Sequence, residues 1–501
     1  MPDIDRPRID LPRSRLIVVT AGLLLSMALS ALDTSIVATA MPRIIDELSG
    51  LEFYAWVTTA YLVTSTTIIP ISGKLGDLFG RKRFVQGGMI GFLVASMLCG
   101  LAATMPQLVA ARAVQGIFGG FLTSSVISSM ADLYLPATRA KIQGIFMSVF
   151  ATASIAGPIV GGILTDTLGW RYVFYVNLPL GIVAFTVVAL TMPRIPTSSH
   201  WRQIDFRGSL LLTAGLVPLL SALSETRDAG WTSPIVLGLL AVAAVMLSLF
   251  VWAETRAAHP IMPLRLFRNR TFTAAVLVSF LAAFAMFGSN IFVPLVYQGL
   301  LGMSATQSGA LLTPRMVAMV AASLLSGQIV TRVTHYRLVG AAGLVSLTFG
   351  LFLLSRVHVG STELDVIVAL IFIGIGFGSN QPIYQNAVQS AVPHEYVGVA
   401  SSQVQFWRSL GQTVGVAVMG AVLTLRIGAQ VPVGETAVVP TSPVERAALA
   451  SGLDGVFFVA AAAAALAIVV ALQLREVPLR GRGRRATSTP IVAPEAASVG
   501  D

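Results

Sequence analysis

The chain has 501 residues, of which 55% are hydrophobic and only 11% carry a charged side chain. Soluble domains carry about 25% charged residues, so the composition argues against a water-soluble globular protein. The net charge of +10 is spread over short loops rather than along one stripe, which disfavours nucleic acid as a partner. The single cysteine, Cys99, excludes an intrachain disulfide.

Long apolar runs divide the chain into fourteen segments, each long enough to cross a membrane. A membrane-spanning helix needs about 20 apolar residues. The first run follows Arg13 and Arg15 and is too long for a cleaved signal peptide. The sequence therefore predicts an all-α polytopic membrane protein. The predicted spans are 16–40, 53–72, 84–104, 107–131, 142–165, 172–192, 208–224, 233–253, 272–298, 306–330, 338–355, 365–388, 398–424 and 453–473.

Basic residues set the expected orientation of these spans. The N-terminus, alternate loops and the tail together hold 24 of the 33 Lys and Arg residues, and the opposite loops hold six. Cytoplasmic loops are enriched in Lys and Arg. We therefore expect both termini in the cytoplasm and a multi-pass protein of the plasma membrane, the inner membrane of a bacterium.

A weak repeat indicates two similar halves. Gln115-Gly116 and Gly157-Pro158 in the first half are echoed by Gly376 to Gly378 and by Gly411 in the second. Such a repeat predicts two six-helix bundles with the substrate near the midplane between them. The predicted regions are a cytoplasmic N-terminus (1–15), an N-terminal bundle (16–192), a linker with two additional helices (193–271), a C-terminal bundle (272–473) and a cytoplasmic, disordered tail (474–501).

The turn from Gly73 to Arg83 contains three glycines, one acid and four basic residues. Glycines permit tight backbone turns, and an aspartate can cap a helix. The spacing resembles the loop between spans two and three of the major facilitator superfamily, G-x-L-[GAS]-D-x-x-G-R-[KR]-[KR]. The resemblance implies a cytoplasmic lock that stabilises the outward-open state. Its residues here are Gly73, Asp77, Gly80, Arg81 and Lys82.

Span five contains a second match, from Ala153 to Gly162. It resembles the antiporter motif G-x-x-x-G-P-x-x-G-G, with Ala153 in place of the first glycine. Glycines one turn apart let helices approach closely, and proline permits a kink. The resemblance implies a conformational role for Gly157, Pro158, Gly161 and Gly162 and favours export, while uptake by proton symport stays an alternative.

Three further segments narrow the family. Arg112 to Gly116 is similar to R-x-x-Q-G, and Leu32 to Ile44 and Gly169 to Pro179 look like fourteen-span drug:proton antiporters of the multidrug efflux type. This resemblance, over about residues 15–475, implies proton-coupled export of drugs or other lipophilic small molecules by alternating access. It also implies a monomer that needs no cofactor besides the proton gradient. Lipid or metabolite transport stays an alternative, because the motifs specify the cargo poorly.

Asp33 is the only acidic residue deep inside a predicted span, where an ionised carboxylate needs a partner or a cavity. At 1.5 Å per residue, Asp33 lies roughly 12 Å and Arg112 roughly 9 Å below the outer surface. We therefore predict that Asp33 and Arg112 interact in the N-terminal bundle and couple proton transfer to transport, with Asp33 also contacting substrate. A static ion pair that locks helix packing is the alternative.

Other polar residues inside the spans are candidates for substrate contact. These are Gln115, Asn290, Asn380, Gln381, Tyr384 and Trp407. Arg315 and Arg408 either contact substrate or hold a helix junction. Single polar groups in membrane helices also serve simply to bond neighbouring helices.

Other functional classes fit less well. No G-x-x-x-x-G-K-[ST] loop for an ATP-driven pump is present, and the five histidines are scattered, so we expect neither an enzyme nor a metal site. A membrane sensor that binds a ligand without moving it stays an alternative.

Overall fold

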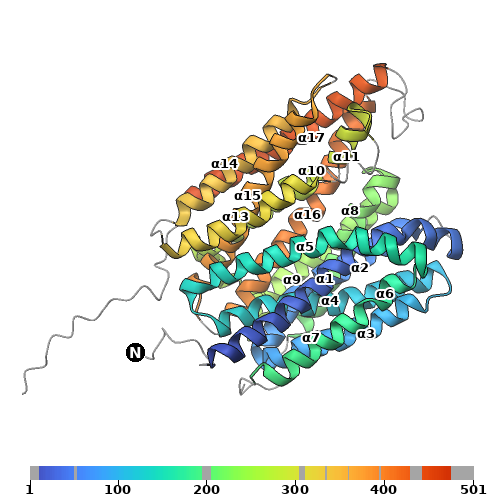
Figure 1. Ribbon diagram of the computed structural model, residues 1–501. Coiled ribbons are helices and arrows are strands. Elements are labelled where there is room, and N and C mark those ends of the chain that lie inside the picture. Colours follow the sequence, from blue (N-terminus) through green and yellow to red (C-terminus); the bar gives the residue numbers. More distant parts are fainter. Residues whose placement is uncertain are drawn as a thin grey trace, which may run out of the picture.

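The computed structural model describes residues 11–49, 53–193, 205–290, 292–303, 311–332, 336–358, 360–393, 396–428 and 443–474 (Figure 1). These ranges contain helices and turns and no strand. The first half consists of α1 (Arg13–Leu48), α2 (Tyr54–Phe79), α3 (Arg81–Gly100), α4 (Met105–Leu133), α5 (Pro136–Thr167), α6 (Tyr172–Tyr175) and α7 (Asn177–Thr191).

A pair of helices, α8 (Phe206–Ala229) and α9 (Pro234–Arg256), follows and leads through the short helix η3 (Leu264–Arg268) into the second half. The second half consists of α10 (Arg270–Asn290), α11 (Val293–Leu295), η4 (Val296–Leu300), α13 (Thr313–Arg332), α14 (Tyr336–Ser355), α15 (Glu363–Ala391), α16 (Val397–Gly428) and α17 (Pro443–Leu472).

Thirteen helices in the described ranges are long and apolar enough to cross a membrane. The predicted span 53–72 falls on α2, a 26-residue helix whose many threonines and serines lower its hydropathy. Each of the fourteen predicted spans thus has a helix. The all-α polytopic fold is confirmed.

Several helices extend beyond the predicted spans. α1 continues through Pro42 to Leu48, although its apolar run ends near residue 40. Backbone hydrogen bonding continues where the side chains become polar, so hydropathy marks only the apolar part of a helix.

The helices form two bundles, coloured blue to green and yellow to red in Figure 1. In the first, α1 packs against α5 and α7, and α4 packs against α2 and α3. In the second, α10 packs against α16 and α17, while α15 packs against α13 and α14. The domain limits 16–192 and 272–473 stay a prediction.

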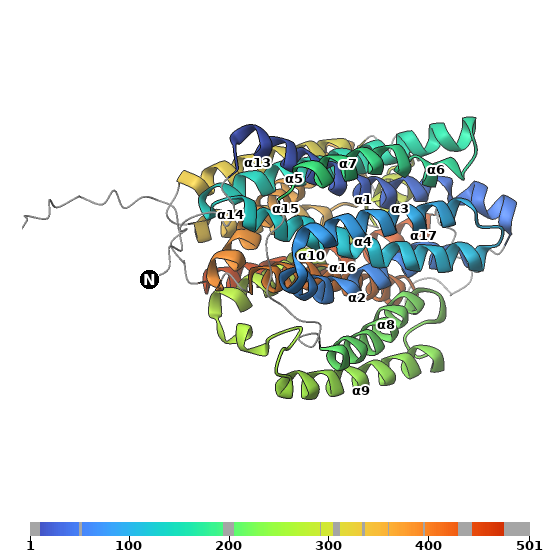
Figure 2. The same cartoon turned by 90° about the horizontal axis from the view of Figure 1, so that it is seen from below.

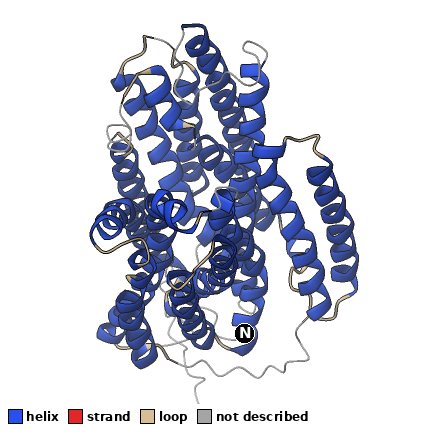
Figure 3. Ribbon diagram, turned by 90° about the vertical axis from the view of Figure 1, so that its right-hand side faces the viewer, coloured by secondary structure: helices blue, strands red, loops and turns tan. Residues whose placement is uncertain are grey.

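Helices α8 and α9 lie beside the bundles as a hairpin (Figures 2 and 3). They pack against each other, and α8 also contacts α2 and α16. Leu212 and Leu216 of α8 join one apolar cluster with Ile69 of α2 and Phe406 of α16. The hairpin therefore contacts one helix from each bundle.

The two bundles meet through α2 with α16, α5 with α13 and α15, and α4 with α16. Gly73 lies against Ser402, and Gly144 against the backbone of Ser323. These contacts lie toward the end of the molecule that carries the turn at Gly80, which we call the basic end. The structure is thus closed between the bundles at the basic end.

Candidate functional site

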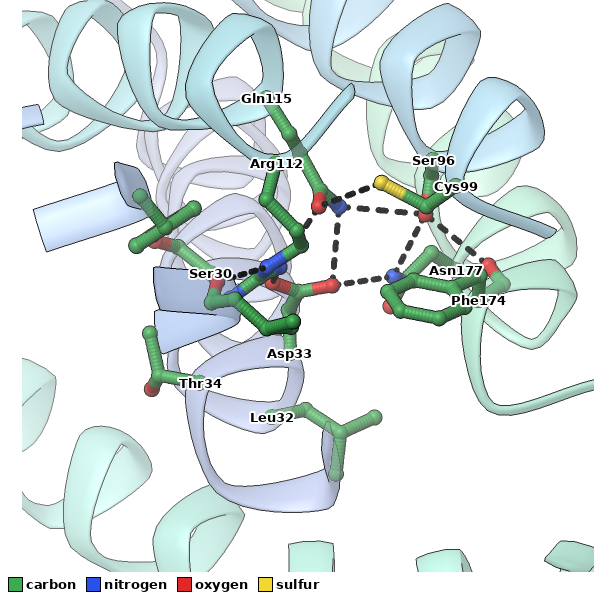
Figure 4. A network of polar contacts seen from close by, with 12 residues as sticks. Ser30, Leu32, Asp33, Thr34, Ser96, Cys99, Arg112, Gln115, Phe174 and Asn177 are labelled. Carbon is green, nitrogen blue, oxygen red and sulfur yellow. Dashed lines mark hydrogen bonds and ion pairs between the residues drawn. The ribbon is translucent and has the colours of Figure 1, made fainter. Parts of the chain in front are cut away.

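Asp33 lies at the centre of a polar network inside the first bundle (Figure 4). Its side chain has no exposed surface, and that of Arg112 is 1% exposed. Arg112 Nη1 donates to Asp33 Oδ2 at 2.6 Å. α1 and α4 therefore bring the two residues into direct contact, and their role in proton coupling stays a prediction.

Two amides hold the other carboxylate oxygen. Gln115 Nε2 and Asn177 Nδ2 donate to Asp33 Oδ1 at 2.9 and 2.8 Å. The same amides reach Ser96 Oγ at 3.2 and 2.9 Å, and Ser96 donates to the carbonyl of Phe174. Residues of α4 and α7 thus contact the buried carboxylate on α1 directly, and α3 joins the network through Ser96.

Further contacts enclose the arginine. Arg112 Nε donates to the carbonyl of Val57 at 3.3 Å, and the guanidinium lies 4.4 Å from the ring centre of Tyr61. Arg112 Nη1 also reaches Gln115 Oε1 at 2.6 Å. A buried ion pair is tolerated when its remaining hydrogen-bonding groups are satisfied. The network meets this condition on both sides of the pair.

This network matches an ionised Asp33. Arg112, Gln115 and Asn177 each present an N–H group to the carboxylate. A protonated carboxyl group would itself be a donor on one oxygen. Protonation would therefore remove the negative charge that Arg112 and the two amides bind, and so weaken all three contacts.

The sequence analysis missed Asn177 and Ser96 as partners of Asp33. Asn177 lies within the Gly169 to Pro179 match, which was a usable signal. Nothing in the sequence marked Ser96 as a partner of Asp33, because a serine in an apolar span is usually a packing residue. Its position is decided by the rotation of α3 against α4.

The turn at the basic end forms a second network of charged groups. Arg81 Nη2 donates to Asp77 Oδ1 at 2.9 Å, and Arg81 Nε lies 3.1 Å from Asp132 Oδ2. The backbone N–H of Val399, at the start of α16, donates to Asp77 Oδ2 at 3.0 Å. Asp77 therefore connects the two bundles directly.

The remaining residues of this turn act locally. Gly80 has a φ of 92°, in the region that favours glycine. Lys82 Nζ donates to the carbonyls of Ala189 and Met192 at 2.7 and 2.5 Å, and so satisfies the end of α7.

Arg139, at the start of α5, donates to the carbonyl of Tyr134. Burial lowers the pKa of Arg139 to about 10, which leaves it cationic at neutral pH.

The residues of the predicted antiporter motif lie on two faces of α5. Gly157 lies against Ser35 of α1, and Gly161 against Ile36 and Thr39. Pro158 is exposed, and no atom outside its own segment lies within 4 Å of the space beside Gly162. The two inward glycines permit the close contact of α1 with α5, one turn from Asp33.

The opposite end of α1 carries a further contact. Glu47 accepts a hydrogen bond from Trp170 Nε1 at 2.8 Å and is paired with Arg171. These donors, Arg171 first, lower the pKa of the Glu47 carboxyl. The segment that begins here continues through α6 to Asn177.

The second bundle holds the other candidate residues. Asn290 accepts a hydrogen bond from Arg315, and Gln381 Nε2 reaches Gln405 Oε1 at 3.4 Å. Asn380 Nδ2 donates to the carbonyl of Gly376 at 2.5 Å. These residues do not contact the Asp33 network.

Tyr384, Trp407 and Arg408 differ from these bonded residues. Within the described ranges, the Tyr384 hydroxyl and Trp407 Nε1 have no hydrogen-bond partner. Trp407 packs edge-to-face with Phe280, with ring centres 6.2 Å apart. Their suggested contact with substrate stays a prediction.

A family model described as the Major Facilitator Superfamily matches residues 23–416. The chain belongs to the major facilitator superfamily. This member is 39% identical over 417 residues to the multidrug transporter protein MdtP of Bacillus subtilis (strain 168), covering 83% of this chain and 77% of that protein. It is 36% identical to multidrug resistance protein 3 of the same strain, covering 81% and 79%.

Among solved structures, the proton:xylose symporter XylE matches with a TM-score of 0.65 at 13% identity, over 93% of this chain and 97% of that one. A likeness at this identity concerns the fold. The predicted resemblance to multidrug efflux members of the superfamily is confirmed. The protein is a multi-pass membrane transporter and not an enzyme.

Proposed function

We propose that this transporter exports drugs or other lipophilic small molecules in exchange for protons, with Asp33 as the proton-binding group. The observation that carries the proposal is the buried contact of Asp33 with Arg112, at 2.6 Å. A lone carboxylate held inside a membrane bundle is costly and is usually functional. MdtP and multidrug resistance protein 3, by their names, support the class of cargo.

The burial of Asp33 favours indirect coupling. Asp33 and Gln115 have no exposed surface in this conformation, so cargo reaches neither residue without a rearrangement. Protonation of Asp33 weakens its charge-assisted bonds to Arg112 and Gln115 on α4 and to Asn177 on α7, which allows these helices to move. Proton and cargo are then coupled through helix positions rather than by competition for one carboxylate.

The basic end faces the cytoplasm in this proposal, in agreement with the distribution of Lys and Arg. Closure at Gly73 and Asp77 then corresponds to a transporter shut on the cytoplasmic side. Alternating access requires these contacts to break as the bundles rock. The energy source is the proton gradient, and one chain is sufficient.

Direction is not decided by the fold, because the fold is shared with a proton:xylose symporter. Export is supported by the resemblance of residues 153–162 to an antiporter motif and by the names of the curated relatives. Proton-coupled uptake would require cargo and protons to move in the same direction.

The test uses purified protein in liposomes that contain a pH-sensitive dye. Cargo is added without a proton gradient, and wild type is compared with Asp33→Asn. We expect cargo-driven proton movement in wild type and none in the variant. Movement of protons and cargo in the same direction would instead show symport.

Asp46→Asn is the matched control, because Asp46 lies on the same helix and is exposed. This control should retain coupling. Full coupling in folded Asp33→Asn would remove Asp33 from the mechanism and leave the ion pair with a packing role only.

A further inference from the structure

Arg408 is a membrane-embedded cation for which the described part of the chain holds no counter-ion. It lies eleven residues into α16, roughly 16 Å from the start of the helix at 1.5 Å per residue. In the described part of the chain, no hydrogen bond, ion pair or aromatic ring contacts its side chain. The other deep arginines differ, since Arg112 is paired with Asp33 and Arg315 donates to Asn290.

The face of α16 that carries Arg408 is directed toward polar neighbours. Ser401 and Gln405 lie seven and three residues before Arg408 and therefore share its face. Ser401 accepts a hydrogen bond from Gln389 of α15 at 2.9 Å, and Gln405 accepts one from Gln381 at 3.4 Å. Gly411 and Gly415, three and seven residues after Arg408, lie against Phe280 and Phe284 of α10. This face is therefore directed between α10 and α15.

Within the described ranges, no carboxylate is paired with Arg408, and the nearby carboxylate of Glu254 on α9 accepts from the backbone N–H of Met262. The sequences of α10, α13, α14 and α16 contain no acidic residue. The acids of α15, Glu363 and Asp365, lie in its first turn. On α2, Asp77 is held by Arg81 and by the N–H of Val399.

The acidic residues of the other helices packed on α16 are also not paired with Arg408. On α4, Asp132 is bonded to Arg81. On α17, Glu445 lies in the first turn, and Asp454 is paired with Arg426 at the end opposite the basic end. On α8, Glu225 and Asp228 lie among the last five residues, toward the end opposite the basic end. Asp205, at the N-cap of α8, accepts from the backbone N–H of Gly208.

We propose that Arg408 binds an oxyanion of the cargo, so that the preferred substrates are organic anions with an apolar body. A guanidinium matches a carboxylate with two parallel hydrogen bonds, and Gln381 and Gln405 supply further amide groups beside it. Phe280 and Trp407, on the adjoining helix faces, provide aromatic surface. The inference rests on the proposed transport function and specifies its cargo.

An anionic cargo has an electrical consequence. Export of a monovalent anion against one entering proton moves two positive charges inward per cycle. An inside-negative membrane potential would therefore drive export strongly. A monovalent cation exchanged for one proton moves no net charge.

The experiment measures binding to purified protein in nanodiscs of zwitterionic lipid, by calorimetry. The three probes share one body and differ in charge: 4-pentylbenzoate, 4-pentylbenzamide and 4-pentylphenyltrimethylammonium. We expect the benzoate to bind about tenfold or more tightly than the other two, as for a charge-assisted pair. Arg408→Gln should abolish this preference, and Arg408→Lys should keep part of it.

Arg426→Gln is the matched control, because it removes one positive charge from the exposed end of the same helix. It should leave the benzoate preference unchanged. Thermal unfolding checks that each variant is folded. If Arg408→Gln does not fold, Arg408→Lys is used for the test in its place.

Three results would overturn the inference: tighter binding of the ammonium probe, an unchanged preference in Arg408→Gln, or no binding of any probe to folded protein. Different results would contradict the inference and the proposed function. Benzoate binding that depends on Arg408 but moves no protons contradicts proton coupling alone. Proton movement driven only by the ammonium probe contradicts the anion site alone.

Discussion

The Asp33 network of the first bundle and the buried glutamines of the second bundle differ in how their polar groups are bonded. In the first, both oxygens of Asp33 are bonded, and Arg112 has a carboxylate, a carbonyl and an aromatic ring as neighbours. In the second, Gln385 and Gln403 are 2% and 0% exposed, yet neither amide has a partner among the described residues.

This difference separates two kinds of site. An ion pair bonded on both sides favours one arrangement, which a change of protonation would disturb. Unbonded amides and an unpaired guanidinium are unfavourable in a closed structure, and they gain partners when water or a ligand reaches them. This contrast supports the proposed division of roles, with proton binding in the first bundle and cargo binding in the second.

The largest expected effect follows from breaking the bonded network. Arg112→Gln leaves Asp33 buried without a cation, and removal of one partner from a buried pair costs about 3–5 kcal/mol. We expect a large loss of thermal stability in detergent. The double variant Asp33→Asn/Arg112→Gln should recover most of it, because neither charge remains. A single variant as stable as wild type would contradict this account.

The next effect tests the contact between the bundles. A valine at Gly73 would collide with Ser402 and with the carbonyl of Gly398. Overpacking costs about 1–3 kcal/mol, which lowers the population of the closed basic end roughly five- to hundredfold. Transport should fall accordingly, and electron spin resonance between labels on α2 and α16 should show a longer distance.

Gly87→Val is the control for Gly73→Val, since no atom lies within 4 Å of the space beside Gly87. It should transport normally. An equal loss in both variants would attribute the effect to valine in the helix rather than to the bundle contact.

The smallest effect compares two glutamines one turn apart on α15. Gln385→Leu removes an amide with no described partner, so it should stabilise the closed protein by about 1–2 kcal/mol. Gln389→Leu removes bonds to Gln143 and Ser401 and should destabilise it. Thermal unfolding of both variants gives the sign of each change in stability. A change of the same sign in both variants would contradict the comparison.

Local patterns determined much of the molecule. Fourteen spans were predicted from apolar runs, and each has a helix, because the length of a spanning helix is set by the membrane. The pairing of Asp33 with Arg112 also followed from the sequence, since depth along two antiparallel helices depends only on residue number.

The partners chosen across helices depended on the tertiary structure. Asn177 and Ser96 join the Asp33 network, and the N–H of Val399 bonds Asp77. Arg408 has no counter-ion among the described residues. Each outcome depends on how a helix is rotated about its axis and how closely it packs. Hydropathy along a span determines its depth in the membrane but not its rotation. The sequence alone therefore determined the helices and the family. Helix packing decided which polar groups meet.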